Sequence, residues 1–159
     1  MKSKIITLLL FSLLLSSCQN SMLKNIPEFS FTTIEGENIS SDSIRGNATV
    51  ICVWATWCGD CIREIPELNE FADENNDVVV YTFNFDQLEV DDLKPIAKKF
   101  NIEVPSLLTH PRDIWGISTP PAVPATFFIN PNGEISLSLF RPQTKDELNS
   151  IFFDLKQGF

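Results

Sequence analysis

The feature that most constrains the fold is an apolar segment that ends just before two closely spaced cysteines. Residues 48–55 are apolar except for one threonine and are rich in Val and Ile, which is typical of a strand buried on both faces of a sheet. Cys58 and Cys61 follow, and apolar side chains then recur at helical spacing over residues 59–75. The chain is therefore expected to pass from a buried strand, through the cysteines, into a helix that covers the sheet.

Strands and helices alternate along the rest of the chain. Further strands are expected at residues 29–34, 78–85, 126–129 and 134–140, and further helices at residues 91–100 and 144–156. The Pro-rich residues 105–124 are expected to be irregular, with at most a short helix at 113–116. A strand–helix–strand order implies a parallel crossover, whereas the last two strands form a hairpin. The pattern predicts an α/β fold with a mixed central sheet and helices on both faces.

Length and charge narrow the possible functions. The chain has 159 residues, with 12 Lys and Arg against 21 Asp and Glu, and a net charge of −9. This length fits one domain, and the acidic balance without a basic run argues against nucleic-acid binding. With one His and four Cys, most zinc-site spacings are excluded, and no metal is expected.

The N-terminus has the pattern of an export signal. Lys2 and Lys4 precede an apolar stretch at residues 5–15 that is too short for a comfortable membrane span. We therefore expect a signal peptide over residues 1–17. The Leu-Ser-Ser-Cys ending at Cys18 resembles a bacterial lipobox, which implies a lipid anchor on Cys18, a linker over residues 18–25 and a folded domain over residues 26–159. An ordinary signal with an incidental cysteine, or an uncleaved anchor, is the alternative.

Cys58 and Cys61 are the candidate reactive groups. Half a zinc site is one alternative, but Cys18 belongs to the lipobox, Cys52 lies within the strand and His110 stands alone. A structural disulfide is another alternative, but closing so small a loop removes little entropy from the unfolded chain and would therefore stabilise the fold little. A redox pair explains the arrangement better. The helix N-terminus should lower the pKa of Cys58, which is expected to be partly exposed and to act as the nucleophile, while Cys61 resolves the mixed disulfide.

These motifs resemble a known family. The Trp57-Cys-Gly-Asp-Cys61 segment, the helical Pro66 and the Val123-Pro124 step are similar to those of the thioredoxin fold. The N-terminal strand, the lipoprotein-type signal and the segment at residues 127–135 resemble its TlpA/ResA-like branch of membrane-tethered thiol–disulfide reductases. The resemblance covers roughly residues 26–157. It implies a three-layer sandwich with an N-terminal β extension.

The resemblance also implies how a client would be bound. Pro124 would be cis and face the disulfide, and the Val123 backbone would pair with an extended client segment. Trp57, Gly59 and Asp60 would contribute to the client-binding surface. Pro120 and Pro121 compete with Pro124 for the cis position.

Two positions depart from the thioredoxin pattern. Six residues before the nucleophile, where thioredoxin has a buried acid, stands Cys52, which is either an inert core thiol or a third redox sulfur. Glu64 matches a glutamate of ResA-like proteins and shares a helix face with Cys61, so we expect it to relay the proton of that thiol. The alternative is a solvated glutamate in an acidic helix.

Asp60 occupies the place of the thioredoxin proline. A carboxylate two residues from the nucleophile repels a thiolate. We therefore expect Asp60 to raise the pKa of Cys58 relative to a neutral residue and to make the pair less oxidising.

The sequence therefore predicts an enzyme that reduces disulfides of exported proteins through a mixed disulfide on Cys58. The resemblance implies clients such as apocytochrome c, electrons from a membrane thiol donor, and a monomer in the cell envelope facing the periplasm or extracytoplasmic space. It implies no cofactor beyond the Cys58–Cys61 disulfide. Alternatives are a disulfide oxidase or isomerase that uses the same pair, and a non-catalytic thioredoxin-like module in metal or stress handling. A peroxidase is disfavoured because no Arg-supported single-cysteine motif is visible.

Overall fold

The computed structural model describes residues 29–158. The expected signal peptide at residues 1–17, the candidate lipidation site Cys18 and the linker at residues 18–25 lie outside the described residues. Within the described range, no helix combines the length and the apolar character that a bilayer crossing requires.

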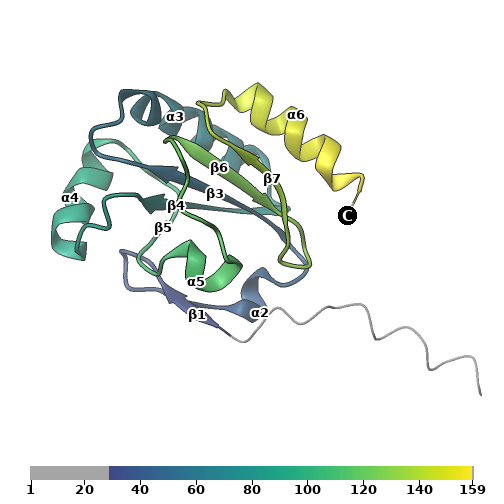
Figure 1. Cartoon of the computed structure of the whole chain (residues 1–159), viewed down its shortest axis with the longest axis horizontal. Helices are drawn as coiled ribbons and strands as arrows, with labels where there is room; N and C mark the ends of the chain where they lie inside the picture. Colours follow the sequence, from purple (N-terminus) through teal and green to yellow (C-terminus); the bar gives the residue numbers. More distant parts are fainter. Residues whose placement is uncertain (1–28, 159) are drawn as a thin grey trace, which may run out of the picture.

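The centre of the fold is a five-stranded mixed sheet with the order β5-β4-β3-β6-β7 (Figure 1). The central strand β3 (Ala48–Trp54) pairs in parallel with β4 (Val78–Asn84) and antiparallel with β6 (Ala125–Ile129). The short strand β5 (Ser106–Leu107) and the hairpin strand β7 (Ile135–Leu139) form its edges. The parallel crossover, the closing hairpin and the mixed sheet are confirmed.

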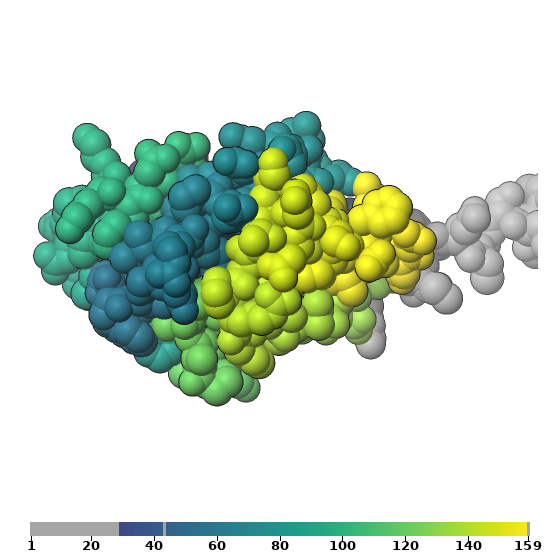
Figure 2. All heavy atoms as spheres, turned by 90° about the horizontal axis from the view of Figure 1, so that it is seen from above, coloured from purple at the N-terminus to yellow at the C-terminus, as the bar shows by residue number. Residues whose placement is uncertain are grey.

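Helices cover both faces of this sheet, as expected. On one face lie α3 (Gly59–Glu74) and α6 (Lys145–Lys156), which are side by side in Figures 1 and 2. The other face is covered by α2 (Ser41–Ile44) and α5 (Pro111–Trp115). The helix α4 (Val90–Lys99) packs Leu93 and Ala97 into the apolar cluster that contains both cysteines of the pair.

The N-terminal β extension is a small separate sheet of β1 (Ser30–Thr32) and β2 (Asn38–Ser40). A bridge between Thr33 and Leu107 joins it to the edge strand β5. The sequence predicted one strand here, and β2, α2 and β5 were not foreseen. These elements have two to four residues each, so they are set by contacts with distant segments rather than by a local pattern.

The strand leading to the cysteines is buried throughout, as predicted. Because successive side chains alternate between the two faces, Ile51 and Val53 enter the core under α5, whereas Val50 and Cys52 face α3 and α6. Cys52 is thereby placed below the helix that begins at the redox pair.

Candidate active site

Cys58 and Cys61 meet where β3 gives way to α3. A turn in which the Cys58 N–H donates to the Ala55 carbonyl (3.1 Å) separates the strand from the helix. Cys58 is the N-cap of α3, and its sulfur accepts a hydrogen bond from the Cys61 N–H at 3.1 Å. The two cysteines form a disulfide with their Cα atoms 5.2 Å apart. The spacing argument is confirmed in geometry, since both sulfurs lie within bonding reach.

Cys58 is less accessible than the sequence analysis expected. Its exposed fraction is 7%, and that of Cys61 is 1%. The Val123 carbonyl oxygen lies 3.6 Å from the Cys58 sulfur, and Val123 packs against the same apolar cluster. The nucleophile therefore sits at the rim of the core, covered by a loop far away in sequence, and Cys61 lies below it.

That covering loop contains a cis proline. The Val123–Pro124 peptide bond is cis, which confirms the expected isomer at Pro124. Within residues 29–158 no other peptide bond is cis, so Pro120 and Pro121 do not hold this position. The residue before the cis bond is the one whose carbonyl contacts Cys58. The Val123–Pro124 step and the disulfide thus face each other, as the resemblance implied.

Trp57 lies next to the nucleophile and is largely exposed, at 67%. Its indole N–H donates to Asp86 Oδ1 at 2.8 Å, and the backbone N–H and the hydroxyl of Thr56 donate to Asp86 Oδ2 at 3.0 and 2.9 Å. Burial alone would raise the pKa of Asp86, but these hydrogen bonds hold it below the ordinary value. Asp86 therefore stays ionised and ties down the turn before Cys58.

Sequence analysis did not identify Asp86 as a site residue. The available signal was its position just after β4, because the carboxyl ends of neighbouring parallel strands meet at the same edge of a sheet.

Glu64 is buried, with an exposed fraction of 2%, so the solvated alternative is wrong. Its Oε1 accepts hydrogen bonds from the Thr126 hydroxyl and from the Gln143 N–H, both at 3.3 Å. Burial raises its pKa from 4.5 to about 7, against the opposing effect of these donors. A carboxyl group on α3 that titrates near neutrality is suited to exchanging protons.

Cys52 is a free thiol below α3. Its sulfur is 3.9 Å from Glu64 Oε2. Burial, followed by the charge of Glu64, raises the pKa of Cys52 well above its ordinary value. The thiol is therefore protonated at neutral pH, which fits an inert core residue and not a third nucleophile.

Gly59 and Asp60 lie in the exposed first turn of α3. A Cβ atom at Gly59 would meet only the Arg63 guanidinium, at 3.9 Å, so packing alone does not require glycine there. Asp60 forms an ion pair with Arg63 one turn later. This pair places a positive charge beside the carboxylate that was expected to repel the Cys58 thiolate.

The described residues contain no group of three or more His, Cys, Asp and Glu side chains that could hold a metal ion. His110 is not part of the redox pair; it caps α5 and accepts a hydrogen bond from the Arg112 N–H at 3.0 Å.

Several known proteins are similar to this chain. The thiol-disulfide oxidoreductase ResA of Bacillus cereus is 26% identical over 127 residues, which are 79% of this chain and 73% of the relative. The sporulation thiol-disulfide oxidoreductase A of Bacillus subtilis is 27% identical over 124 residues, covering 76% of this chain and 74% of the relative.

Solved structures of thiol–disulfide oxidoreductases are also similar to this chain. StoA of Bacillus subtilis superposes with a TM-score of 0.65 at 25% identity, over 80% of this chain and 97% of StoA. A thioredoxin-family thiol:disulfide interchange protein of Chlorobium tepidum superposes with a TM-score of 0.64 at 26% identity, over 80% and 92% of the two chains. The thioredoxin-like fold is confirmed. A sequence profile described as the AhpC/TSA family matches residues 22–138. The chain therefore belongs to the AhpC/TSA family, and within it resembles the ResA and StoA proteins.

Proposed function

We propose that this protein is a thiol–disulfide oxidoreductase that reduces disulfide bonds of exported proteins. The observation that carries the proposal is the Cys58–Cys61 disulfide at the start of α3, with the Cys58 sulfur 3.6 Å from the carbonyl that precedes a cis proline. The names of the ResA and StoA relatives support the same activity. The redox group is the protein's own cysteine pair.

The reaction is two successive thiol–disulfide exchanges. In the reduced protein the Cys58 thiolate attacks one sulfur of a client disulfide, and the other client sulfur leaves as a thiolate. The deprotonated Cys61 then attacks the Cys58 sulfur, which releases the second client thiolate. Two electrons pass to the client, which takes up two protons, and Cys58 and Cys61 end as a disulfide. The Cys61 N–H, which donates to the Cys58 sulfur at 3.1 Å, and the N-terminus of α3 both favour the attacking thiolate.

Glu64 would take the proton of Cys61 in the second exchange. It lies one turn after Cys61 on α3, and its pKa of about 7 means that both protonation states are populated at neutral pH. A carboxylate in that range can accept the thiol proton and later return it to solvent or client. The second carboxyl oxygen of Glu64, Oε2, contacts the Cys52 sulfur.

The client would lie across the surface that surrounds Cys58. Its extended backbone would pair with Val123, which is the short β-augmentation implied by the family. Trp57, Gly59 and Asp60 are the exposed residues that flank Cys58 in the sequence. These four residues are proposed as the client-binding surface, with Pro124 shaping it.

The protein would work outside the cytoplasm, held at a membrane by a lipid on Cys18 after removal of residues 1–17. A membrane thiol carrier would reduce the Cys58–Cys61 disulfide after each turnover. Clients would be exported proteins with oxidised cysteines, such as apocytochrome c. Cys58 and Cys61 lie in the same chain, so the exchange needs no second copy, which favours a monomer.

A trapping experiment tests the reaction. Cys61→Ala, expressed at native level in its own host, should accumulate mixed disulfides between Cys58 and its clients, visible on non-reducing gels and identified by mass spectrometry. The Cys58→Ala/Cys61→Ala double variant is the control and should accumulate none. Equal capture by the two variants, or none by either, contradicts the proposal.

The direction of electron flow is tested by the reduction potential. The wild type is equilibrated with glutathione buffers, and its thiol content is measured. A reductase should have a potential near or below the roughly −270 mV of thioredoxin, whereas a value near about −120 mV would indicate an oxidase.

A further inference from the structure

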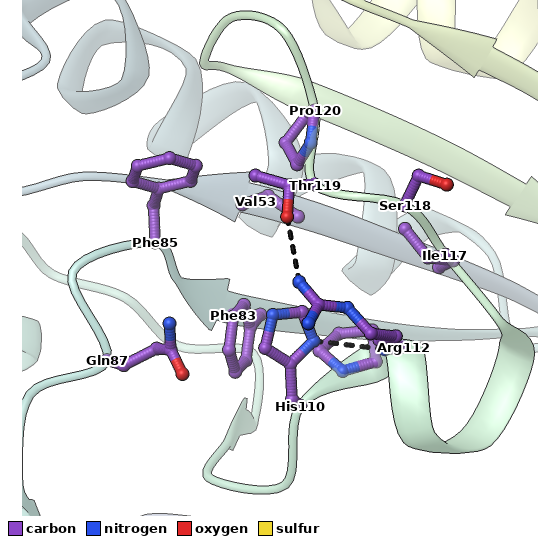
Figure 3. A pocket seen from close by; sticks show the side chains of 11 residues that line it. Val53, Phe83, Phe85, Gln87, His110, Arg112, Ile117, Ser118, Thr119 and Pro120 are labelled. Atoms are coloured by element: carbon purple, nitrogen blue, oxygen red, sulfur yellow. Dashed lines mark hydrogen bonds between the residues drawn. The ribbon is translucent and has the colours of Figure 1, made fainter.

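A pocket outside the redox pair lies on the α5 side of the sheet (Figure 3). It is a cavity of about 120 Å³ between the carboxyl ends of β3 and β4, the start of α5 and the loop at residues 117–120. Its apolar part is formed by the buried side chains of Val53, Phe83 and Ile117. Nothing in the proposed exchange chemistry uses this space.

The polar part of the pocket contains an arginine but no carboxylate. Arg112 donates to the Thr119 hydroxyl at 2.8 Å, as Figure 3 shows, and forms no ion pair with any residue of the described range 29–158. None of the residues that line the pocket is Asp or Glu. In a chain with 21 acidic and 12 basic residues, an arginine without a carboxylate partner marks a place where an anion is favoured.

His110 adds a second donor beside Arg112. Its ring packs on Phe83, with 4.7 Å between ring centres, and its Nδ1 accepts the Arg112 N–H. Burial, followed by the nearby Arg112 charge, lowers the pKa of His110 against the opposing charge of Asp113, which does not line the pocket. The imidazole is therefore neutral with its proton on Nε2, where it can donate but carries no charge.

The pocket lies close enough to the redox pair for one client segment to reach both. Phe85 lines the pocket and packs edge-to-face on Trp57, with 6.4 Å between ring centres. Pro120 also lines the pocket, and it lies three residues before Val123, whose carbonyl contacts Cys58. Three extended residues span at most about 11 Å, so a client needs only a few residues to cover the same path.

The size of the pocket fits one apolar side chain. A cavity of roughly 150 Å³ in another protein holds a benzene ring, so a space of about 120 Å³ accommodates a group the size of a leucine side chain. If a client side chain fills the pocket, the next residue of the client would lie beside Arg112, which lines the pocket and is exposed.

We propose that this pocket is a client-binding subsite for an apolar side chain next to a carboxylate, a few residues from the client cysteine that bonds to Cys58. This inference rests on the proposed function and names a sequence preference within it. The subsite selects the segment of a client, and the cysteine pair performs the exchange.

Two synthetic peptides test the subsite. Each contains one cysteine, blocked as a mixed disulfide with the coloured thiol 2-nitro-5-thiobenzoate, and a Leu-Glu or a Leu-Gln pair about three residues before it. Reduced protein releases the coloured thiolate, and kcat/KM is measured for both peptides. Leu-Glu should be preferred by roughly three- to tenfold, the range expected for one exposed charge-assisted contact. The net charge of −9 would by itself disfavour the acidic peptide, so this preference isolates a local contact.

Arg112→Gln should bring the ratio of the two kcat/KM values to about one, and Arg112→Lys should restore part of it. Lys98→Gln, which removes the same charge from the last turn of α4, should leave the ratio unchanged. Urea unfolding of each variant verifies that it is folded. Equal rates for both peptides in the wild type, or a preference that survives Arg112→Gln, overturns the subsite and leaves the proposed function intact. Failure to reduce either peptide overturns both.

Discussion

Glu64 is held so that its two carboxyl oxygens have different surroundings. Oε1 accepts from the Gln143 N–H and the Thr126 hydroxyl, whereas Oε2 lies 3.9 Å from the Cys52 sulfur. When the group is neutral, its proton therefore belongs on Oε2. The same thiol can donate to the ionised form and accept from the neutral one, so Glu64 can titrate without a rearrangement of its neighbours.

Replacing Glu64 should change how stability depends on pH. Its pKa is about 7 in the folded protein and 4.5 without burial, so the folded state binds more protons between these values and stability falls as pH rises through them. The full effect is about 3 kcal/mol of unfolding free energy. In the Glu64→Gln variant the unfolding free energy should no longer decrease in this way as the pH rises. Urea unfolding at pH values between about 4 and 8 measures it.

Glu70→Gln is the matched control on the same helix. Its side chain is 63% exposed and pairs with Lys145 at 3.2 Å. The unfolding free energy of the Glu70→Gln variant should depend on pH as that of the wild type does. If Glu64→Gln also follows the wild type, then Glu64 does not titrate near neutrality and the proposed proton relay loses its basis.

Removing the Cys52 thiol should raise the pKa of Glu64 further. The thiol is one of the groups that stabilise the charged carboxylate, whereas the burial that raises the pKa remains. Cys52→Ala should therefore shift the carboxyl titration above about 7, measured by NMR on carbon-13-labelled glutamate. Cys52→Ser keeps a donor and should shift it less. A downward shift in the alanine variant would mean that the thiol does not stabilise the charged form.

Individual site residues were predictable when their role follows from nearby sequence. Cys58, Cys61 and the cis Pro124 belong to short motifs, and Glu64 lies one turn along the same helix. The partners of these residues were not predictable. Gln143 is 79 positions from Glu64, and only the folded sheet brings them together. The burial of Cys58 was missed for the same reason, because it depends on Val123.

At the scale of elements, the turn between β3 and α3 is fixed by a residue at the end of the neighbouring strand. Asp86 accepts three hydrogen bonds from Thr56 and Trp57. The position of the nucleophile therefore depends on the pairing of β3 with β4 as well as on the helix that it caps.

Asp86→Ala should loosen this turn. It leaves the Thr56 N–H and the Trp57 indole without their acceptor, which should cost about 1–3 kcal/mol of unfolding free energy. Reduction of a protein disulfide should slow as well, because Cys58 follows directly. Urea unfolding and the rate of insulin reduction measure the two effects. Asp73→Ala, an exposed change on α3, is the control. Equal stability of the two variants would contradict the anchoring role.

The long elements followed from periodicity, whereas the short ones did not. Each of the long elements has at least five apolar positions to define it. This holds for the strands β3 and β4 and for the helices α3 and α6. The two-residue strand β5 carries no such signal. It forms because it pairs with β4 and with the N-terminal segment.

For the molecule as a whole, we predict that attachment to the membrane depends on one residue outside the described range. Cys18→Ala should move the protein from the membrane fraction to the soluble fraction of cells, because the lipid would be lost. Purified wild type and variant should reduce insulin equally, since the redox pair lies in the folded domain. Fractionation followed by immunoblotting measures the first effect. A variant that stays with the membrane would show that Cys18 is not the anchor.

The attachment of the N-terminal sheet to β5 has a consequence for behaviour at high concentration. The Ile34 N–H donates to the Ser106 carbonyl at 2.9 Å, and the Leu108 N–H donates to the Thr32 carbonyl at 2.8 Å. The outer edge of the sheet is thus already occupied by the chain itself, and the opposite edge strand β7 meets β6 through an irregular register. Within residues 29–158, neither edge of this sheet is therefore both long and regular, and a long, regular edge is the template on which proteins stack into fibres. Crowded copies should therefore stay separate.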